Sequence, residues 1–228
     1  MYGLNDAPLL WQLCLKHFLI KVLHARTSLF DDCSFSWLEK GKLTAALTSH
    51  VDDILVISTP SWLQKTRLQL EARFGAVSRQ TMPLMHVGCL YEHIETDPHG
   101  HKTVKISQQH FADSIKLMTV RKAEPTTPCD AQEQHDFRAS IGALLYLCMT
   151  RLDLVAEVVI LQSKVCCSTI GDLLACNQVF RRAKQYSPRG IIYRPLQPPV
   201  RILAFSDASF AKSKTSYATE GCLVLITS

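Results

Sequence analysis

Two adjacent aspartates, Asp52 and Asp53, interrupt a run of strand-forming residues in the stretch ALTSHVDDILVIS at residues 45–57. The apolar and β-branched residues on both sides predict strands at 43–49 and 54–58, with the aspartates at or near the bend of a β-hairpin. Two carboxylates on a tight hairpin can bind a hard cation such as Mg²⁺, which completes its shell with water and substrate phosphates. Two such ions, about 3.5–4 Å apart, stabilise the attacking and leaving oxygens in phosphoryl transfer.

A solvated turn is the alternative for these two aspartates, because Asp is a frequent turn residue. Their neighbours along the chain are apolar, which favours a hairpin of the protein core over a hydrophilic loop. Two-metal phosphoryl transfer also normally requires at least one more carboxylate from a neighbouring element. The pair therefore indicates a metal site only together with further features of the chain.

The elements around this hairpin predict a chain that mixes helices and strands, an α+β fold. Pro8 precedes a helical apolar pattern at 9–24, and Ser61 and Gly75 are the expected N-cap and stop of a second helix. The other expected elements are an extended segment at 28–38, strands at 84–96 and 102–107, a helix at 107–118, a connector at 122–134, helices at about 137–148, 152–166 and 171–187, and strands at 200–206 and 221–226.

The composition indicates a globular protein with a mild basic charge. Of the 228 residues, 47% are hydrophobic and 20% are charged, and the net charge is +5. These values exclude a disordered tail and are compatible with a polyanionic partner. The most apolar stretch, residues 141–161, carries Arg151, Asp153 and Glu157, which a membrane-spanning helix tolerates poorly. We therefore expect no transmembrane segment and no membrane partner.

The nine cysteines include no Cys-x-x-Cys pair, and no signal peptide is evident. An odd number of cysteines without such spacing predicts reduced, mostly buried thiols, and neither a disulfide framework nor a zinc site. We therefore expect an intracellular protein, cytoplasmic or nuclear.

Several motifs resemble those of reverse transcriptases. HVDD at residues 50–53 resembles their Y-V-D-D signature, and MYGLNDAPLLW at residues 1–11 resembles the LYGLKQAPRAW motif of copia-type retrotransposon polymerases. Further blocks of the same family resemble, in order, the stretches VGCLYEHI, ISQQHFADSI, FRASIGALLYLCMTRLDLVAEV and FSDASFA. Because six blocks follow in the right order over nearly the whole chain, the sequence resembles a copia-type LTR retrotransposon polyprotein. The matching part is the C-terminal part of the reverse transcriptase region, running into the start of ribonuclease H.

The resemblance implies a specific form of the α+β fold. Residues 1–96 would be a partial fingers and palm of a right-hand polymerase, an antiparallel sheet with helices that includes the HVDD hairpin and a primer-grip-like hairpin. Residues 97–190 would be a mainly helical thumb and connection. Residues 200–228 would be the truncated start, the first β-hairpin, of a ribonuclease H-like domain.

The resemblance also implies roles for individual residues. Asp52 and Asp53 would be catalytic and metal-binding, and Asp207 would be the first metal ligand of ribonuclease H, although a strand-end turn is its alternative. Contacts with nucleotide or template would involve Gly3, Asp6 and His50; Gly3 could equally be a turn residue and His50 a packing residue. The primer grip would comprise Val87, Gly88, Leu90 and Tyr91. The implied cofactors are two Mg²⁺ (or Mn²⁺) ions, and the implied partners are an RNA or DNA template-primer, deoxynucleotides and other polyprotein segments.

Some residues depart from the family pattern. A further catalytic aspartate is expected on a strand upstream of YGL, and this chain begins with Met1-Tyr2-Gly3. Asp31 and Asp32 follow YGL and are expected to form a turn instead. Asp6 stands where the family usually has Gln, and the chain ends before the remaining acids of ribonuclease H. We therefore expect no, or barely detectable, DNA synthesis by this chain, and an unpaired edge on the hairpin 43–58.

The last fifty residues are rich in basic side chains, and within them Arg181, Arg182 and Lys184 are the expected contacts with a nucleic-acid backbone. A solvated helix end is the alternative for these three residues. Three functions remain open at this point: a piece of a reverse transcriptase, a non-catalytic remnant of a decayed element with residual nucleic-acid binding, or an unrelated metal-binding or interaction protein.

Overall fold

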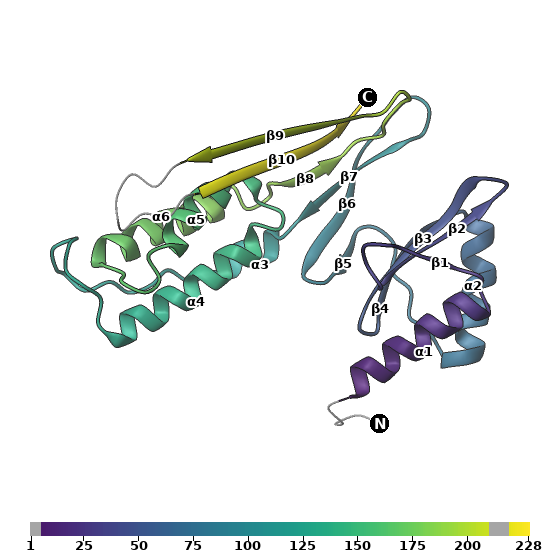
Figure 1. The fold of residues 1–228 in the computed structure, drawn as a ribbon, viewed down its shortest axis with the longest axis horizontal. Helices are drawn as coiled ribbons and strands as arrows, with labels where there is room; N and C mark the ends of the chain where they lie inside the picture. Colours follow the sequence, from purple (N-terminus) through teal and green to yellow (C-terminus); the bar gives the residue numbers. More distant parts are fainter. Residues whose placement is uncertain (1–5, 210–218) are drawn as a thin grey trace. The chain divides into compact units, whose positions relative to one another are not determined.

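The structure is a computed structural model that describes residues 6–209 and 219–228 (Figure 1). The chain forms two compact units, Met1–Thr81 and Met82–Ser228. Every strand pair among the described residues is antiparallel, so the fold mixes helices with antiparallel sheets, as the sequence indicated. No helix of the described parts is long and apolar enough to span a membrane.

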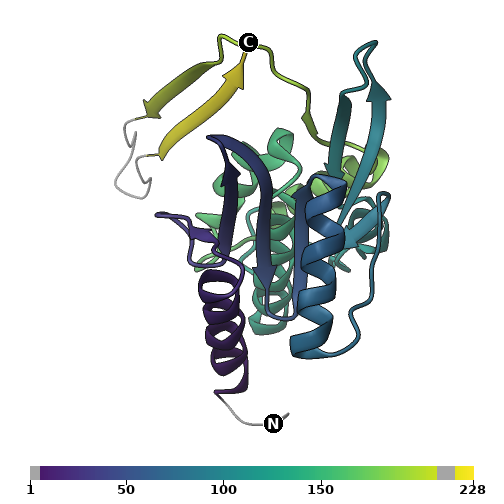
Figure 2. The ribbon, with the colours of Figure 1, turned by 90° about the vertical axis from the view of Figure 1, so that its right-hand side faces the viewer.

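The first unit is a four-stranded sheet in the order β1-β2-β3-β4 with two helices. Its elements, in chain order, are α1 (Ala7–Lys21), β1 (Arg26–Thr27), β2 (Ser34–Glu39), β3 (Lys42–His50), β4 (Asp53–Ser58) and α2 (Pro60–Phe74). Both helices pack against the same face of the sheet, because Leu15 and Leu19 of α1 and Leu70 of α2 share one core with Phe35 and Leu47 of the sheet (Figure 2). β4 is an edge strand, so the expected unpaired edge of the hairpin is confirmed for the described residues.

Local sequence signals place the helix starts of this unit almost correctly. Both helices have a proline in their first turn, where the missing N–H costs no hydrogen bond. The expected N-cap Ser61 is wrong: α2 begins at Pro60, and Thr59 in an extended conformation occupies the N-cap. The stop at Gly75 is confirmed, because this residue lies at φ 92°, a backbone region that favours glycine.

The extended segment expected at 28–38 is only partly correct, since β2 begins at Ser34. Asp31 closes a turn in front of it: its carboxylate accepts hydrogen bonds from the Cys33 N–H at 2.9 Å and from the Ser34 hydroxyl. Lys16 forms an ion pair with Asp32 at 2.7 Å. The turn expected for these two aspartates is therefore confirmed.

The second unit contains a four-stranded sheet in the order β5-β6-β7-β8, a helical bundle and a separate two-stranded hairpin. Its elements, in chain order, are β5 (Leu84–His86), β6 (Cys89–Thr96), β7 (Lys102–Ser107), α3 (Gln109–Ser114), α4 (Ala131–Leu147), the 3₁₀ helix η1 (Leu152–Leu154), α5 (Val155–Gln162), α6 (Ile170–Gln185), β8 (Gly190–Tyr193), β9 (Arg201–Ser209) and β10 (Thr219–Thr227). The bundle core joins α4, α5 and α6 through Phe137, Leu144, Val158 and Phe180.

The helix expected at 107–118 is too long, since α3 ends at Ser114. Side chains of α6 hold the following residues in an extended path. The Lys184 ammonium donates to the carbonyl of Ile115 at 2.8 Å. The side chain of the buried Asn177 bonds both the N–H and the C=O of Met118 at 2.9 Å. These backbone groups are therefore satisfied without a helix, which explains the difference.

Two other expectations about this unit need correction. The connector expected at 122–134 ends earlier, because Asp130 and Glu133 form a capping box that starts α4 at Ala131. The thiols are less buried than expected: all nine cysteines are free, but only Cys89 and Cys176 are buried. Burial raises the pKa of the Cys176 thiol to about 12.

Candidate metal-binding hairpin

The two aspartates lie at a two-residue hairpin turn, as the sequence predicted. His50 at the end of β3 pairs with Asp53 at the start of β4, so that Val51 and Asp52 form the turn. Both carboxylates belong to residues exposed to solvent. Their backbone position is set by six consecutive residue pairs of the β3–β4 ladder, which makes the hairpin a firm base for the two acids.

The alternation of side chains along β3 and β4 decides the direction of Asp53. Ala45 and Leu47 are buried against the helices, and Val56, the partner of Leu47, packs against the same core. Side chains alternate between faces along a strand. Asp53 and its partner His50 therefore lie on the sheet face opposite to the helices of this unit.

The turn residue Val51 has a φ of 54°. A β-branched residue in this left-handed region costs roughly 1–2 kcal/mol, so surrounding contacts must hold the turn in this conformation. One such contact comes from α1: the indole N–H of Trp11 donates to the carbonyl oxygen of Val51 at 2.7 Å. The Trp11 ring in turn packs edge-on against Phe74 of α2, with the ring centroids 5.2 Å apart.

The structure describes two of the three residues expected to contact nucleotide or template, Asp6 and His50. Asp6 is the N-cap residue of α1, but its exposed side chain makes no capping hydrogen bond. His50 is exposed beside the turn. Gly3 lies outside the described residues, so its expected role stays a prediction.

The metal-binding capacity of the hairpin follows from its donor set. Two adjacent exposed carboxylates fit a Mg²⁺ ion that completes its shell with water and phosphate oxygens. A site for two ions needs more ligands, and residues 6–209 and 219–228 contain no group of three or more His, Cys, Asp or Glu side chains able to hold a metal ion. The chemistry of the two carboxylates is thus compatible with one ion, and the described residues do not supply the further ligands that two ions need.

The expected primer-grip residues form a second hairpin, in the other unit. β5 and β6 meet at the pair His86 and Cys89, with Val87 and Gly88 as the two turn residues at φ 48° and 71°. The hydroxyl of Tyr146 in α4 donates to the carbonyl of Val87 at 3.1 Å.

The other two expected primer-grip residues lie on β6. There Leu90 pairs with Ser107 and Tyr91 with Ile106 of β7. Burial raises the pKa of the Tyr91 hydroxyl. The single strand expected at 84–96 is therefore wrong, since the segment forms two strands separated by this turn.

Asp207 lies in β9, where it pairs with Gly221 of β10, and it is exposed. It is thus a strand residue and not part of a strand-end turn. The β9–β10 hairpin extends over Arg201–Ser209 and Thr219–Thr227, longer than expected.

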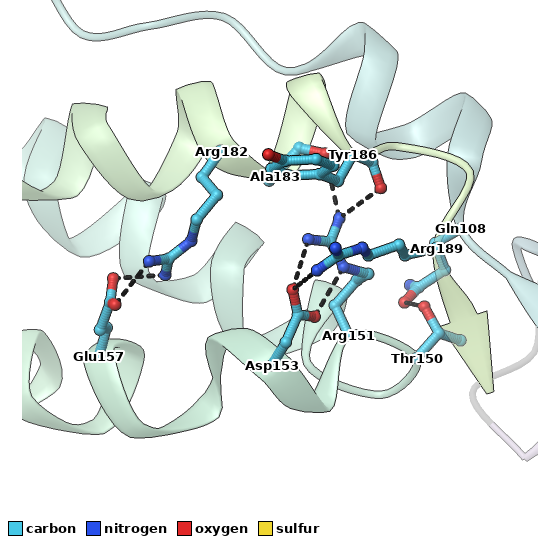
Figure 3. A network of polar contacts seen from close by, with 9 residues as sticks. All are labelled: Gln108, Thr150, Arg151, Asp153, Glu157, Arg182, Ala183, Tyr186 and Arg189. Atoms are coloured by element: carbon cyan, nitrogen blue, oxygen red, sulfur yellow. Dashed lines mark hydrogen bonds and ion pairs between the residues drawn. The ribbon is translucent and has the colours of Figure 1, made fainter.

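Two of the three basic residues expected to contact nucleic acid are engaged within the second unit. Arg182 forms a paired contact with Glu157, with one N–O distance of 2.7 Å (Figure 3). Lys184 donates to the Ile115 carbonyl. Arg181 is exposed. The carboxylate of Glu157 offsets the charge of Arg182, whereas Lys184, which bonds a neutral carbonyl, keeps its full charge and is exposed.

The sequence pattern did not reveal a role for Arg151, which is only 2% exposed. Its guanidinium bonds both carboxylate oxygens of Asp153, at 2.8 and 2.9 Å, and the carbonyls of Ala183 and Tyr186 at the end of α6 (Figure 3). Hydrogen bonds from Arg151 lower the pKa of Asp153. This pair of a buried guanidinium and an exposed carboxylate ties η1 to the C-terminal end of α6 and is a structural feature of the bundle.

Comparisons with known proteins agree with the resemblance seen in the motifs. No family model matches the chain, and no solved structure matches it. The chain is 25% identical to each of two proteins of Arabidopsis thaliana, the retrovirus-related Pol polyproteins from transposon RE1 and from transposon RE2. Each alignment extends over 242 residues and covers 99% of this chain but only 16% of the relative. The resemblance is thus confirmed, and the chain is related over nearly its whole length to one segment of retrotransposon Pol polyproteins.

Proposed function

We propose that the chain is part of the RNA-directed DNA polymerase of a copia-type retrotransposon, and that Asp52 and Asp53 bind Mg²⁺ in its polymerase site. The observation that carries the proposal is the β3–β4 turn. It places two adjacent exposed carboxylates at the end of a regular ladder, within the HVDD motif. A solvated surface loop would lack both the ladder and the link from Trp11.

In this proposal the chain binds and orients the reactants. Asp52 and Asp53 hold the metal, which when bound supplies charge stabilisation at phosphate oxygens. His50 and Asp53 share the sheet face opposite to the helices, so a template-primer would approach from that side. The Val87–Gly88 turn acts as a primer-grip-like hairpin, and Arg181 contributes a contact with the nucleic-acid backbone.

The proposal includes the palm, thumb and ribonuclease H parts in the ranges 1–96, 97–190 and 200–228, with Asp207 as a metal ligand of the last. It also includes no, or barely detectable, DNA synthesis by the chain alone. Because the described residues provide no third acid at Asp52 and Asp53, a further carboxylate from another polyprotein segment completes the site. The edge of β4 has backbone groups free to pair with a strand that carries it.

Binding of Mn²⁺ to the purified chain, measured from the EPR signal of free Mn²⁺, tests the metal site. We expect weak binding that is lost in the double variant Asp52→Asn/Asp53→Asn. The matched control is Asp31→Asn/Asp32→Asn, which removes another adjacent pair of acids in the same unit. In that pair, Asp31 accepts hydrogen bonds within its turn and Asp32 forms an ion pair with Lys16. Equal loss in both double variants, or loss in neither, would reject the metal site.

Primer extension with Mg²⁺ or Mn²⁺ tests the activity. We expect no, or barely detectable, synthesis from the chain alone. Template-dependent synthesis that Asp52→Asn abolishes would confirm the polymerase assignment and reject the predicted inactivity.

The non-catalytic alternative, a remnant that only binds nucleic acid, depends on the basic segment. Arg182, one of the three basic residues expected to make such contacts, already has a carboxylate partner in the second unit, which gives this alternative less support than the metal-binding hairpin has. A chain that binds nucleic acid with a steep salt dependence but binds no Mn²⁺ would instead support the remnant.

A further inference from the structure

The link between α1 and the β3–β4 turn suggests a role for a residue outside the acidic motif. We propose that Trp11 is a positioning residue for the metal-binding hairpin, and that its indole N–H sets the direction in which Asp52 and Asp53 project. This inference rests on the proposed function of the hairpin, because a direction matters only if the two carboxylates bind a common ion.

The first step is the position of the contact. Trp11 lies in the first half of α1 and donates to Val51 across 40 residues of sequence, at 2.7 Å. The acceptor is the carbonyl of the turn residue immediately before Asp52. A rotation of the peptide unit between Val51 and Asp52 would break this hydrogen bond and would reorient the Asp52 backbone, so the bond opposes that rotation.

The second step is the rigidity of the donor. The Trp11 ring packs edge-on against Phe74 at 5.2 Å, and Phe74 packs against Phe18 at 5.3 Å. Phe18 is buried in the core of the unit. The indole ring is therefore held by a series of aromatic contacts that leads to the buried Phe18.

The third step is the need for such a restraint. Val51 has a φ of 54°, which a β-branched residue adopts only under the control of its surroundings. The two-residue connection of the ladder already requires a positive φ at this residue, and the hydrogen bond from Trp11 adds a restraint on the strained turn. Without this bond, the turn should open more often. The metal site would then lose its fixed arrangement of two carboxylates, although its ligands would still be present.

The test compares Trp11→Phe with Trp37→Phe in the full chain. Phenylalanine at position 11 keeps an aromatic ring beside Phe74 and removes the N–H. Trp37 is a matched control, because its indole N–H also donates to a backbone carbonyl in the same unit, that of Leu23 at 2.6 Å, but away from the turn. Mn²⁺ affinity by EPR is the readout, with the melting temperature measured for each variant.

We expect Trp11→Phe to weaken Mn²⁺ binding by about threefold to tenfold, the range of one lost hydrogen bond. Trp37→Phe should leave the Mn²⁺ affinity unchanged. It should lower the melting temperature at least as much as Trp11→Phe does, because Trp37 is more deeply buried than Trp11. Unchanged affinity in Trp11→Phe, or an equal loss in Trp37→Phe, would overturn the positioning role.

A second readout needs no metal and separates this inference from the proposed function. Amide hydrogen exchange at His50 and Asp53, the pair that closes the turn, should be faster in Trp11→Phe than in the wild type and in Trp37→Phe. If the wild type binds no Mn²⁺ through Asp52 and Asp53, the proposed function fails, and the exchange rates alone decide whether Trp11 restrains the turn.

If the Trp11→Phe variant does not fold, the wild type still provides a test. Added Mn²⁺ should broaden the indole N–H signal of Trp11 more strongly than that of Trp37, because only Trp11 contacts the turn. Equal broadening of the two signals would overturn the proposal.

Discussion

The β3–β4 turn and the β5–β6 turn are built alike but present different groups. Each has two residues, begins with a valine at positive φ, 54° at Val51 and 48° at Val87, and is held by an aromatic donor from a helix of its own unit. The second residue differs. It is the exposed Asp52 in one turn, and in the other it is Gly88, where an added Cβ would overlap with the Tyr146 hydroxyl.

The second residue of each turn determines whether the turn presents a charged group to solvent or packs its backbone against a helix. An exposed second residue can carry a charged side chain without any cost to the fold, which suits a ligand for a metal ion. A second residue without room for a Cβ brings the backbone close to α4, which suits a rigid link between sheet and bundle. Both turns begin with a positive φ at a valine, but only the β5–β6 turn continues with a second positive φ, at Gly88. The turn of the first unit therefore presents an acid to solvent, and the turn of the second unit fixes its primer-grip-like hairpin against α4.

Gly88→Ala should produce the largest effect. The residue has φ 71° and faces the Tyr146 hydroxyl, so strain and overlap together should lower the free energy of unfolding of the second unit by about 2–4 kcal/mol. Urea unfolding followed by far-UV CD measures it. Gly100→Ala is the control, since Gly100 has φ 85° but nothing near its Cβ position; equal losses in the two variants would show that Tyr146 contributes nothing.

Tyr146→Phe should have a smaller effect in the same unit. It removes the hydrogen bond to Val87 but keeps the edge-on contact of the ring with Phe111 at 4.9 Å. We expect a loss of about 0.5–1.5 kcal/mol in the free energy of unfolding. Combining it with Gly88→Ala should give less than the sum of the two losses, because both changes act on one contact; strict additivity would contradict the shared contact.

Val51→Asn should stabilise the first unit by about 0.5–1 kcal/mol, because Asn tolerates positive φ and Val51 is 53% exposed and loses little packing. Tryptophan fluorescence during urea unfolding reports on this unit alone, since Trp11, Trp37 and Trp62 all lie in it. Val87→Asn is the counterpart and should gain less, because Val87 is partly buried. A loss of stability in Val51→Asn would show that the turn is not strained.

Asp52→Asn should have the smallest effect on stability, within about 0.5 kcal/mol of the wild type, because the side chain is exposed. Its effect on Mn²⁺ affinity should be large by comparison. The pair of measurements completes the contrast with Gly88→Ala, which should alter stability without changing the metal site. A strong destabilisation by Asp52→Asn would place this aspartate among structural residues.

Local patterns in the sequence predicted much of the candidate site. The alternation on both sides of the two aspartates located β3, β4 and the turn within one residue of their ends, because strand periodicity and turn chemistry act between near neighbours. The capping signal Asp130 to Glu133 was also present in the sequence, although it was assigned to a connector.

Other elements depend on groups far away along the chain. The early end of α3 depends on Asn177 and Lys184, about sixty to seventy residues later. β8 was not expected, since only its pairing with β7 makes a strand of Gly190–Tyr193. The ion pair between Arg182 and Glu157 likewise could not be inferred from the basic composition of the segment.

The sequence by itself determined the similarity of the chain to a segment of retrotransposon Pol polyproteins and the location of the HVDD hairpin, because ordered motifs and a period of two residues are local properties. The tertiary structure alone decided what holds the hairpin and which charges stay free. Hydrogen bonds such as Trp11 to Val51 and Tyr146 to Val87 join residues 40 and 59 positions apart. These partners are determined by how the helices pack on the sheets, and the spacing of residues along the chain does not indicate them.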